Sequence, residues 1–597
     1  MASLAHKLSA IVGAAFDEQG LPAKLGQVRV SDRPDLAQFQ CNGAMAAKQS
    51  EALFAKKEGR PPRNPREIAQ DVVEYLKEKK STPFKSAGWV SPIFIGDKIN
   101  IAGPGFINLN ITGEYLAAHL KDVAANARGG APQTGDDKTV ILDYGGPNIA
   151  KPMHVGHLRS SIIGDALRRM MNFAGYKALG DVHMGDWGTP MGMILSALEI
   201  ENDIAPITME RLEGIYPTAA AACKEDPARM DAAREATRKL QDGDPVYRAR
   251  WQEFIDVSIA GMKENFDNLG VHFDLWKGEA DVHDLIAPMA KGLQASGLAK
   301  DDDGAVIVDV TQDDDKKEMP PLMLYKRDGA VMYGTTDLAT IVDRMNSYSP
   351  AKILYVVDQR QSLHFEQLFR AAKKSGIAPE ATALTHAGFG TMNGPDGKPF
   401  KTRAGGVMRL EDLIAMGVEK ATARLDEADL AADMNAGERK DVAHKVAIAA
   451  IKFADLQNNR ISDYVFDLDR MTAFEGKTGP YLLYQAVRIK SLLRKAAAQG
   501  FAPANDFVLQ APDQTLALLL SEWPDHFANA LSGYAPHILC DYAFRLAQEF
   551  SSFYGNCHIL SEEDEALRAS RLGLCAFTAR QLELILGLLG IDIPDRM

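Results

Sequence analysis

The feature that most constrains the fold is a strand, a glycine turn and a helix that follow one another between residues 139 and 175. β-forming residues at 139–143 end in an acid, and Gly145 and Gly146 follow directly. From residue 158 to residue 171 apolar side chains recur three and four positions apart, and Gly175 is placed to end a helix. This order is typical of α/β proteins with a parallel sheet.

Two histidines and a lysine stand where that helix begins. Lys151, His154 and His157 lie within "AKPMHVGH", and Gly156 separates the histidines. Free N–H groups and the positive dipole end of a helix attract phosphate, and a glycine lets a flat ring approach the backbone. We interpret these side chains as a phosphate-binding set. The plain alternative is that one histidine caps the helix and the other is exposed.

The sequence around these residues resembles a known family. "PMHVGHLRSS" resembles the "HIGH" signature of class I aminoacyl-tRNA synthetases, and "GKPFKTR" stands where that class carries "KMSKS", with Pro399 and Phe400 as departures. "GDWGTPMG", "YGTTDLA", "QSLHFEQLF", "FEGKTGPYLLY" and "LGLLGIDIPDRM" are together similar to bacterial-type arginyl-tRNA synthetases. The resemblance extends over nearly the whole chain. In that family a lysine before the first histidine is thought to support catalysis, and Lys151 occupies that place.

The resemblance implies a two-step reaction. L-Arginine would be activated by ATP to arginyl-adenylate and then transferred to the 3′-terminal ribose of tRNA(Arg), releasing pyrophosphate and AMP. ATP would enter as its Mg²⁺ complex. The catalytic residues implied are Lys151, His154, His157, Lys398 and Lys401. The ATP-binding residues implied are His154, Gly156, His157, Lys398, Lys401 and Thr402.

A pocket for arginine should be built from oxygen acceptors, because a guanidinium is a planar fork of donors. Tyr333 and Asp337 stand four apart on a helical stretch and hence on one face. With the resemblance, the arginine-binding residues are Asp143, Asn148, His154, Tyr333, Asp337 and Gln361. His364 either joins this site or is a satisfied core histidine, and Asp337 could instead form a local surface pair or helix cap.

Two segments are expected to hold tRNA. The helical stretch "TGPYLLYQAVRIKSLLRK" carries Tyr481, Tyr484 and Arg488, which would place aromatic rings for base stacking beside cations for phosphates. The resemblance assigns this region to the anticodon loop, and a solvated basic face with buried tyrosines is the alternative. Near the N-terminus, Phe39, Gln40 and Asn42 are expected to help hold the tRNA elbow.

At 597 residues the chain is too long for one hydrophobic core. We predict a multidomain α/β protein. Residues 1–115 would form a small α+β tRNA-binding domain, and residues 136–430 a Rossmann-like parallel-sheet catalytic domain with a helical insertion at about 195–271. Residues 440–597 would form an all-α anticodon-binding bundle. The strand candidates of the catalytic domain are "TVILD", "KALGDVHMG", "AVIVDVT", "KILYVVD" and "LTHAGFGTM".

Composition bears on the cellular compartment, on disulfides and metal sites, and on how tRNA could be bound. The five cysteines are scattered and never form a C-x-x-C pair, which favours a reducing cytoplasm and argues against disulfides and structural zinc. A net charge of −13 means that tRNA must be gripped by a local basic surface. No apolar run approaches the roughly 18 residues of a membrane helix, and the N-terminus favours an amphipathic helix over a signal peptide. We expect a cytoplasmic monomer without a metal site of its own.

Three alternatives stay open. Another class I synthetase would share the signatures, although cysteine specificity would need a zinc-binding cysteine set and the branched aliphatic specificities a large editing insertion. A small-molecule nucleotidylyltransferase also uses H-x-G-H but would leave the C-terminal helices unexplained. An inactive relative that only binds tRNA would have no reason to keep His154, Gly156, His157 and both loop lysines.

Overall fold

The computed structural model describes residues 3–33, 35–78, 93–94, 98–327, 329–394, 396–398, 408–430 and 433–597. The chain forms two compact units. Unit 1 comprises Met1–Pro132, Gln485–Asn529 and Asp541–Ile585, and unit 2 comprises Gln133–Tyr484, Ala530–Cys540 and Leu586–Met597. The units do not follow the three predicted domains, because the region 440–597 contributes to both. The predicted domain boundaries stay predictions.

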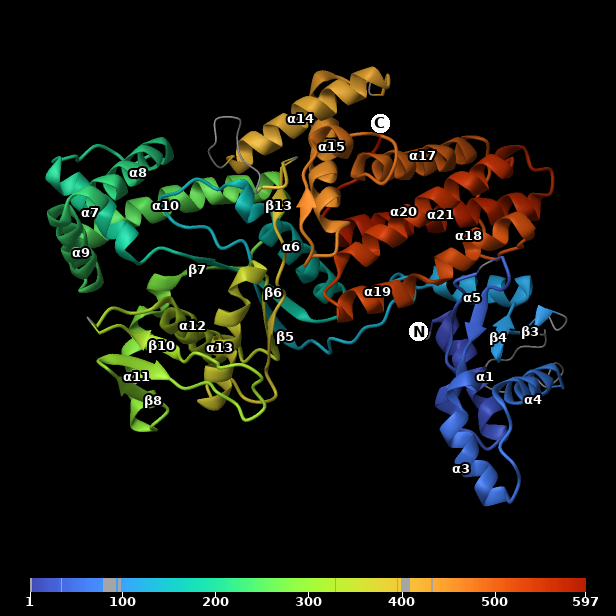
Figure 1. Ribbon diagram of the computed structural model, residues 1–597. Coiled ribbons are helices and arrows are strands. Elements are labelled where there is room, and N and C mark those ends of the chain that lie inside the picture. The colour runs from blue at the N-terminus through green and yellow to red at the C-terminus, as the bar shows by residue number, and fades with distance from the viewer. Residues whose placement is uncertain are drawn as a thin grey trace. The chain divides into compact units, whose positions relative to one another are not determined.

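Unit 1 combines a small sheet with two groups of helices (Figure 1). The sheet is antiparallel in the order β1-β2-β4-β3, with β1 (Val28–Val30), β2 (Phe39–Cys41), β3 (Asn100–Ala102) and β4 (Phe106–Leu109). β1 pairs with β2, and β3 pairs with β4 across the turn at Gly103 and Gly105. The helices that accompany the sheet are α1 (Leu4–Glu18), α2 (Gly43–Ala46), α3 (Lys48–Glu58), α4 (Pro65–Glu78) and α5 (Gly113–Ala125).

The C-terminal region is helical, as its apolar spacing predicts. Its helices are α17 (Gly479–Ala498), α18 (Ala511–Ser521), α19 (Trp523–Ser532), α20 (Pro536–Asn556) and α21 (Glu565–Leu588). Within unit 1, Ser551 of α20 donates to Gln485 of α17 at 3.1 Å, and Lys490 of α17 pairs with Glu583 of α21 at 2.6 Å. Side chains such as Trp523, Phe527 and Leu546 are fully buried among these helices.

Unit 2 is built on a five-stranded parallel sheet in the order β12-β11-β5-β6-β7. The strands are β5 (Thr139–Asp143), β6 (Lys177–Met184), β7 (Leu275–Gly278), β11 (Lys352–Tyr355) and β12 (Ala383–His386). Ile141, Leu142, Ile353 and Leu354 are all fully buried, as expected for a sheet covered on both faces. The predicted Rossmann-like sheet is confirmed.

Two details of the strand prediction differ from the structure. The "AVIVDVT" strand, β9 (Ala305–Val308), belongs to a separate antiparallel sheet with β8 (Ala299–Asp302) and β10 (Leu322–Tyr325). β7 was not among the predicted strands. A short apolar run indicates a strand but not its partner, and "LWKG" is too short and mixed to stand out.

Helices fill the rest of unit 2 (Figure 1). The predicted helical insertion is confirmed as the end of α7 (Thr189–Ile200) followed by α8 (Met209–Glu225), α9 (Pro227–Gln241) and α10 (Pro245–Asn268). The remaining elements are α6 (Leu158–Phe173), α11 (His283–Ala295), α12 (Tyr333–Tyr348), α13 (Ser362–Lys374), α14 (Leu410–Glu427), α15 (Ala436–Leu456), α16 (Leu468–Met471) and the short paired strands β13 (Met392–Asn393) and β14 (Tyr464–Val465).

A buried lysine ties the last residues of the chain into unit 2. Lys452 of α15 is 1% exposed, and its ammonium donates to the carbonyl of Gly590 at 2.7 Å and to that of Gly270 at 3.2 Å. Burial lowers the pKa of Lys452 to about 8, and the neighbouring Asp165 of α6 opposes that shift. Residues 586–597 therefore complete the packing around the helix that follows the glycine turn.

Packing also fixes the turn between β5 and α6. Ser160 of α6 accepts a hydrogen bond from the N–H of Gly145 at 2.8 Å and donates to the carbonyl of Val356 at 2.6 Å. The Tyr144 ring is 1% exposed and lies directly against α6 at Gly164, where an added Cβ would come within 2.2 Å of the ring. Only glycine leaves room for Tyr144 at this helix position.

We predict that Gly164→Ala destabilises the protein although alanine is the better helix former. Overpacking costs about 1–3 kcal/mol, which exceeds the gain of at most about 1 kcal/mol from helix propensity. The matched control is Gly214→Ala in α8, where nothing lies within 4 Å of the added Cβ and a small gain is expected. Thermal unfolding of both variants measures the effect. A Gly164→Ala protein as stable as the control variant would contradict the packing argument.

Candidate active site

The first signature forms a short turn that leads into α6. His154 caps the 3₁₀ turn η4 (Val155–His157), and its Nδ1 accepts the N–H of Gly156 at 3.1 Å. The Nδ1 of His157 accepts the N–H of His154 at 3.2 Å, and the two ring centroids lie 4.0 Å apart. A neutral imidazole that accepts at Nδ1 carries its proton on Nε2. Each histidine therefore keeps one N–H donor for a ligand.

Both imidazoles are held in the neutral form. Burial lowers the pKa of His157 to about 3, and the neighbouring His154 adds to the shift. Burial and the charge of Lys151 lower the pKa of His154. The structure therefore leaves each histidine as a neutral group with a free donor, and the positive charge beside them is that of Lys151. Their predicted contact with phosphate stays a prediction.

The segment 408–410, which follows the second signature in the sequence, is hydrogen-bonded to the first signature. The Met408 carbonyl accepts the N–H of Val155 at 3.0 Å, and the N–H of Leu410 donates to the carbonyl of Met153 at 3.0 Å. Arg409 and His154 thereby form an antiparallel bridge. The segment that follows the predicted loop lysines is fixed beside the histidines.

The loop lysines themselves are only partly described. The N–H of Lys398 donates to the Asp396 carboxylate at 3.1 Å. Lys401 and Thr402 lie outside the described residues. Their predicted contacts with ATP stay predictions.

The predicted arginine-binding residues of α12 meet the predicted His364. Asp337 Oδ2 lies 2.6 Å from His364 Nε2, and the ring centroids of Tyr333 and His364 are 4.6 Å apart. His364 is 8% exposed, while Tyr333 is 60% exposed. His364 is thus a buried histidine, and it also contacts the predicted pocket residues Asp337 and Tyr333. Tyr333 offers its ring to solvent or to a ligand.

The other predicted arginine ligands stand at loops beside the sheet. Asn148 is exposed and bridges to Gly185, and Gln361 is exposed directly before α13. Asp143 ends β5, but its Oδ2 already accepts from Arg344 at 2.6 Å. Arg344 is 1% exposed and also pairs with Asp181 at 2.8 Å. A protein guanidinium therefore occupies one side of Asp143.

Sequence reasoning missed two acids at the ends of neighbouring strands. Asp186 follows β6, is 4% exposed and accepts the N–H of Ala280 at 3.0 Å, and burial raises its pKa to about 7. Glu279 follows β7, and burial raises its pKa with a contribution from Asp337. Ligands of parallel sheets bind at the carboxyl ends of strands. The rule that selected Asp143 could already have selected Asp186, which directly follows the predicted strand at 177–185, and it would have selected Glu279 had β7 been predicted.

The structure places the predicted N-terminal tRNA residues in different environments. Phe39 is 1% exposed in β2, so its ring belongs to the core of the sheet and leaves no surface for a base. This corrects its predicted role as a direct contact. Gln40 donates to Asn108 at 3.1 Å, and Asn42 lies at the start of α2. Contact of these two residues with tRNA stays a prediction.

The predicted anticodon-binding residues all lie on α17. Tyr481 and Tyr484 are partly buried and belong to unit 2, whereas Arg488 belongs to unit 1. The Arg488 guanidinium lies 4.4 Å from the ring centroid of Tyr554. Partial burial of both tyrosines leaves the two readings, base stacking and internal packing, as predictions.

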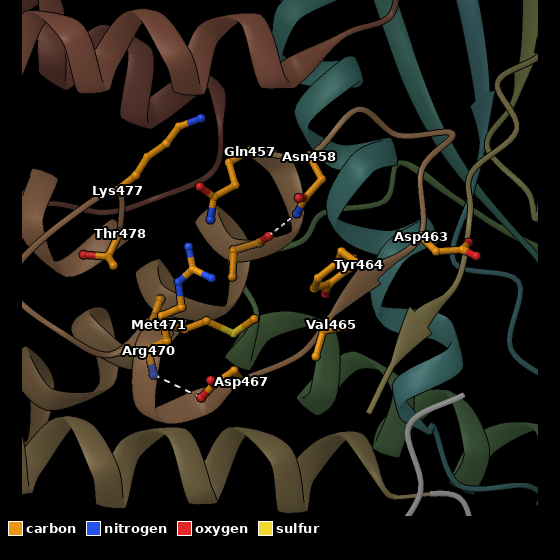
Figure 2. A pocket seen from close by; sticks show the side chains of 12 residues that line it. Gln457, Asn458, Asp463, Tyr464, Val465, Asp467, Arg470, Met471, Lys477 and Thr478 are labelled. Carbon is orange, nitrogen blue, oxygen red and sulfur yellow. Dashed lines mark hydrogen bonds between the residues drawn. The ribbon is translucent and has the colours of Figure 1, made fainter. Parts of the chain in front are cut away.

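Unit 2 contains a cavity of about 380 Å³, and the residues that line it come before α17 in the sequence. Figure 2 shows Arg470 and Gln457 projecting into it, with Lys477 and Thr478 on one side and Tyr464 on the other. Asp467 is turned back to cap α16 by accepting the N–H of Arg470 at 3.1 Å. The exposed walls of the cavity are therefore rich in hydrogen-bond donors.

Comparison with known proteins agrees with these observations. A model for the catalytic domain of class I tRNA synthetases (R) matches residues 119–468, the DALR anticodon binding domain matches 482–597, and the arginyl tRNA synthetase N terminal domain matches 2–111. Arginine–tRNA ligases of Maricaulis maris and Hyphomonas neptunium are 49% and 48% identical over 614 aligned residues, and each alignment covers both chains completely.

Solved structures show the same fold. Arginyl-tRNA synthetase from Plasmodium falciparum superposes with a TM-score of 0.81 at 24% identity, and that from Thermus thermophilus with 0.78 at 22% identity. Both comparisons cover 100% of each chain.

The match over residues 119–468 defines the class as that of the class I aminoacyl-tRNA synthetases, which activate an amino acid with ATP. Within that class the chain belongs to the arginyl-tRNA synthetase family. It is therefore an enzyme that ligates arginine to tRNA, and the resemblance stated from the sequence is confirmed.

The described residues also bear on metal binding and on membrane spans. No group of three or more His, Cys, Asp or Glu side chains in that part of the chain could hold a metal ion. No helix among the described residues is long and apolar enough to cross a membrane. All five cysteines are buried and free.

We predict that His157 stays neutral well below the pH at which an ordinary histidine titrates, near 6.5. Because its folded pKa of about 3 lies below the unfolded value, the unfolded chain takes up the extra proton as the pH falls from about 6.5 to 3. This residue therefore makes folding stability fall with pH in that window. NMR of ¹³C-labelled histidine measures it, with His157→Gln for assignment and the denatured protein as reference. A titration midpoint of His157 above pH 6 in the folded protein would contradict this prediction.

Proposed function

We propose how the residues of this site divide the work of arginine–tRNA ligation. The observation that carries the proposal is the hydrogen-bonded junction of residues 153–155 with 408–410, which joins the first signature to the segment that follows the loop lysines in the sequence. Two Nε2–H donors, from His154 and His157, and the ammonium of Lys151 then share one place. That place is suited to a polyphosphate.

In the first step, an arginine carboxylate oxygen attacks the α-phosphorus of ATP and pyrophosphate leaves. The carboxylate is already ionised, so no general base is needed, and the cost is negative charge that builds on the phosphates. Donors and cations fixed before the reaction stabilise that charge. We assign this role to His154, His157 and Lys151, and to Lys398 and Lys401 of the loop. Gly156 and Thr402 complete the proposed ATP site.

In the second step, a hydroxyl of the terminal ribose of tRNA attacks the arginyl carbonyl carbon, and AMP leaves. Mg²⁺ would arrive with ATP and supply further charge at its phosphates. We propose that Tyr481, Tyr484 and Arg488 of α17 contact the anticodon region, and that Gln40 and Asn42 contact another part of the tRNA. A monomer in the cytoplasm is the proposed setting.

Recognition of arginine would rest on Asp337 and Tyr333, with Asn148, Gln361 and Asp143 around the α-amino end. Asp337 keeps Oδ1 for the guanidinium, because Oδ2 faces His364. A partly buried acid left unpaired by citrulline or misplaced against lysine rejects both analogues more strongly than apolar fit could.

We predict that His157→Ala abolishes most of the charging of total tRNA with labelled arginine, because it removes one fixed donor to the phosphates. Loss of one such donor costs about 10²–10³-fold in rate. The assay runs all twenty amino acids with MgATP and follows the thermal midpoint of the variant. If the parent protein charges tRNA with an amino acid other than arginine, the proposed arginine pocket is wrong. Binding of tRNA with no charging at all would make the inactive relative the leading alternative.

We predict that Asp337→Asn raises the KM for arginine about 10- to 150-fold, because a charge-assisted hydrogen bond is worth roughly 1.5–3 kcal/mol. The matched control is Asp343→Asn on the same helix, whose carboxylate pairs with Lys277 and not with His364. Steady-state kinetics measure both variants. An arginine KM unchanged in Asp337→Asn, or raised equally in the control, would mean that the pocket is misplaced.

A further inference from the structure

One face of the insertion helix α8 reaches Lys151, which precedes the two histidines, and Arg409, which lies in the segment hydrogen-bonded to them. Glu213 and Tyr216 stand three residues apart on α8 and hence on the same face. Glu213 meets the segment that follows the loop lysines, and Tyr216 meets the segment that precedes the histidines. α8 is otherwise packed against the other helices of the insertion, so these two side chains connect the insertion to the chemistry.

Tyr216 holds the ammonium of Lys151. The Lys151 Nζ lies 4.4 Å from the centroid of the Tyr216 ring, and both residues are partly buried. Lys151 forms no ion pair with any carboxylate of the described residues. A lysine side chain is long and freely rotating, and an aromatic face restrains its ammonium without neutralising it. A carboxylate in that place would compete with a phosphate for the same charge, whereas the ring leaves the charge available.

Glu213 holds the other segment through an independent contact. Its carboxylate pairs with the guanidinium of Arg409, and only 18% of the Glu213 side chain is exposed. The backbone on both sides of Arg409 is hydrogen-bonded to residues 153–155. The same helix face therefore contacts the segment around Arg409 and the Lys151 side chain that precedes the two histidines.

We propose that this face of α8 positions Lys151 and the segment around Arg409, and that Tyr216 is the positioning residue that holds Lys151 at the phosphate site. The inference rests on the catalytic role proposed above for Lys151. Tyr216 acts through the lysine, so its removal should slow the chemical step and leave arginine binding intact.

The test compares Tyr216→Leu, which removes the ring, with Tyr216→Phe, which keeps it. Tyr216→Leu should lower kcat of arginylation about 3- to 30-fold, the range expected for a cation–π contact, with the KM for arginine unchanged. Tyr216→Phe should restore a rate near that of the parent protein. Equal losses in both variants, or a faster Tyr216→Leu enzyme, would overturn the proposal.

A double-mutant cycle separates positioning from a merely structural role. If Tyr216 acts through Lys151, then Tyr216→Leu combined with Lys151→Ala should be no slower than Lys151→Ala alone. Additive losses would overturn the inference while leaving the Lys151 assignment in place. A parental rate in Lys151→Ala would remove that assignment and the inference with it. Thermal midpoints are measured for every variant.

Glu213→Gln supplies a second variant that keeps the side-chain shape. Loss of a partly exposed ion pair should lower kcat up to about fivefold, again with the KM for arginine unchanged. The control on the same helix is Thr218→Ala, whose exposed hydroxyl bonds only to the Gly214 carbonyl. An unaffected kcat in Glu213→Gln would overturn the Glu213 half of the proposal.

Discussion

The site depends on two backbone hydrogen bonds, from Val155 to Met408 and from Leu410 to Met153. They join segments separated by about 250 residues into one short antiparallel ladder. Backbone bonds of this kind are indifferent to side-chain identity, so this ladder does not depend on the signature residues that precede it in the sequence, where Pro399 and Phe400 depart from the usual pattern.

The neutral state of the histidines follows from the same geometry. Each Nδ1 is occupied by a backbone N–H, and burial disfavours the charged form. A neutral donor gains strength as charge develops on a phosphate, yet it does not bind the ground state as tightly as a cation would. The division of work proposed for the imidazoles and lysines would therefore favour turnover over tight retention of ATP.

Sequence patterns predicted the parallel sheet, the insertion and the approximate place of the site, because strand–glycine–helix spacing and charged residues at strand ends are local signals. They did not predict Arg344 against Asp143, or Glu213 and Tyr216 against the signatures, since these contacts join elements far apart in the chain. Phe39 was predicted to be a surface contact because it stands in a polar stretch of the sequence. Side chains alternate between the two faces of the short strand β2, and that of Phe39 faces the core.

The contact between Lys452 and Gly590 has a consequence for the order of synthesis. The helix after the glycine turn is made early, but part of its surroundings comes from residues 586–597. During translation the surroundings of this helix therefore stay incompletely packed until residues 586–597 have been made. A nascent chain halted before residue 590 would expose the buried ammonium and its acidic neighbour to water.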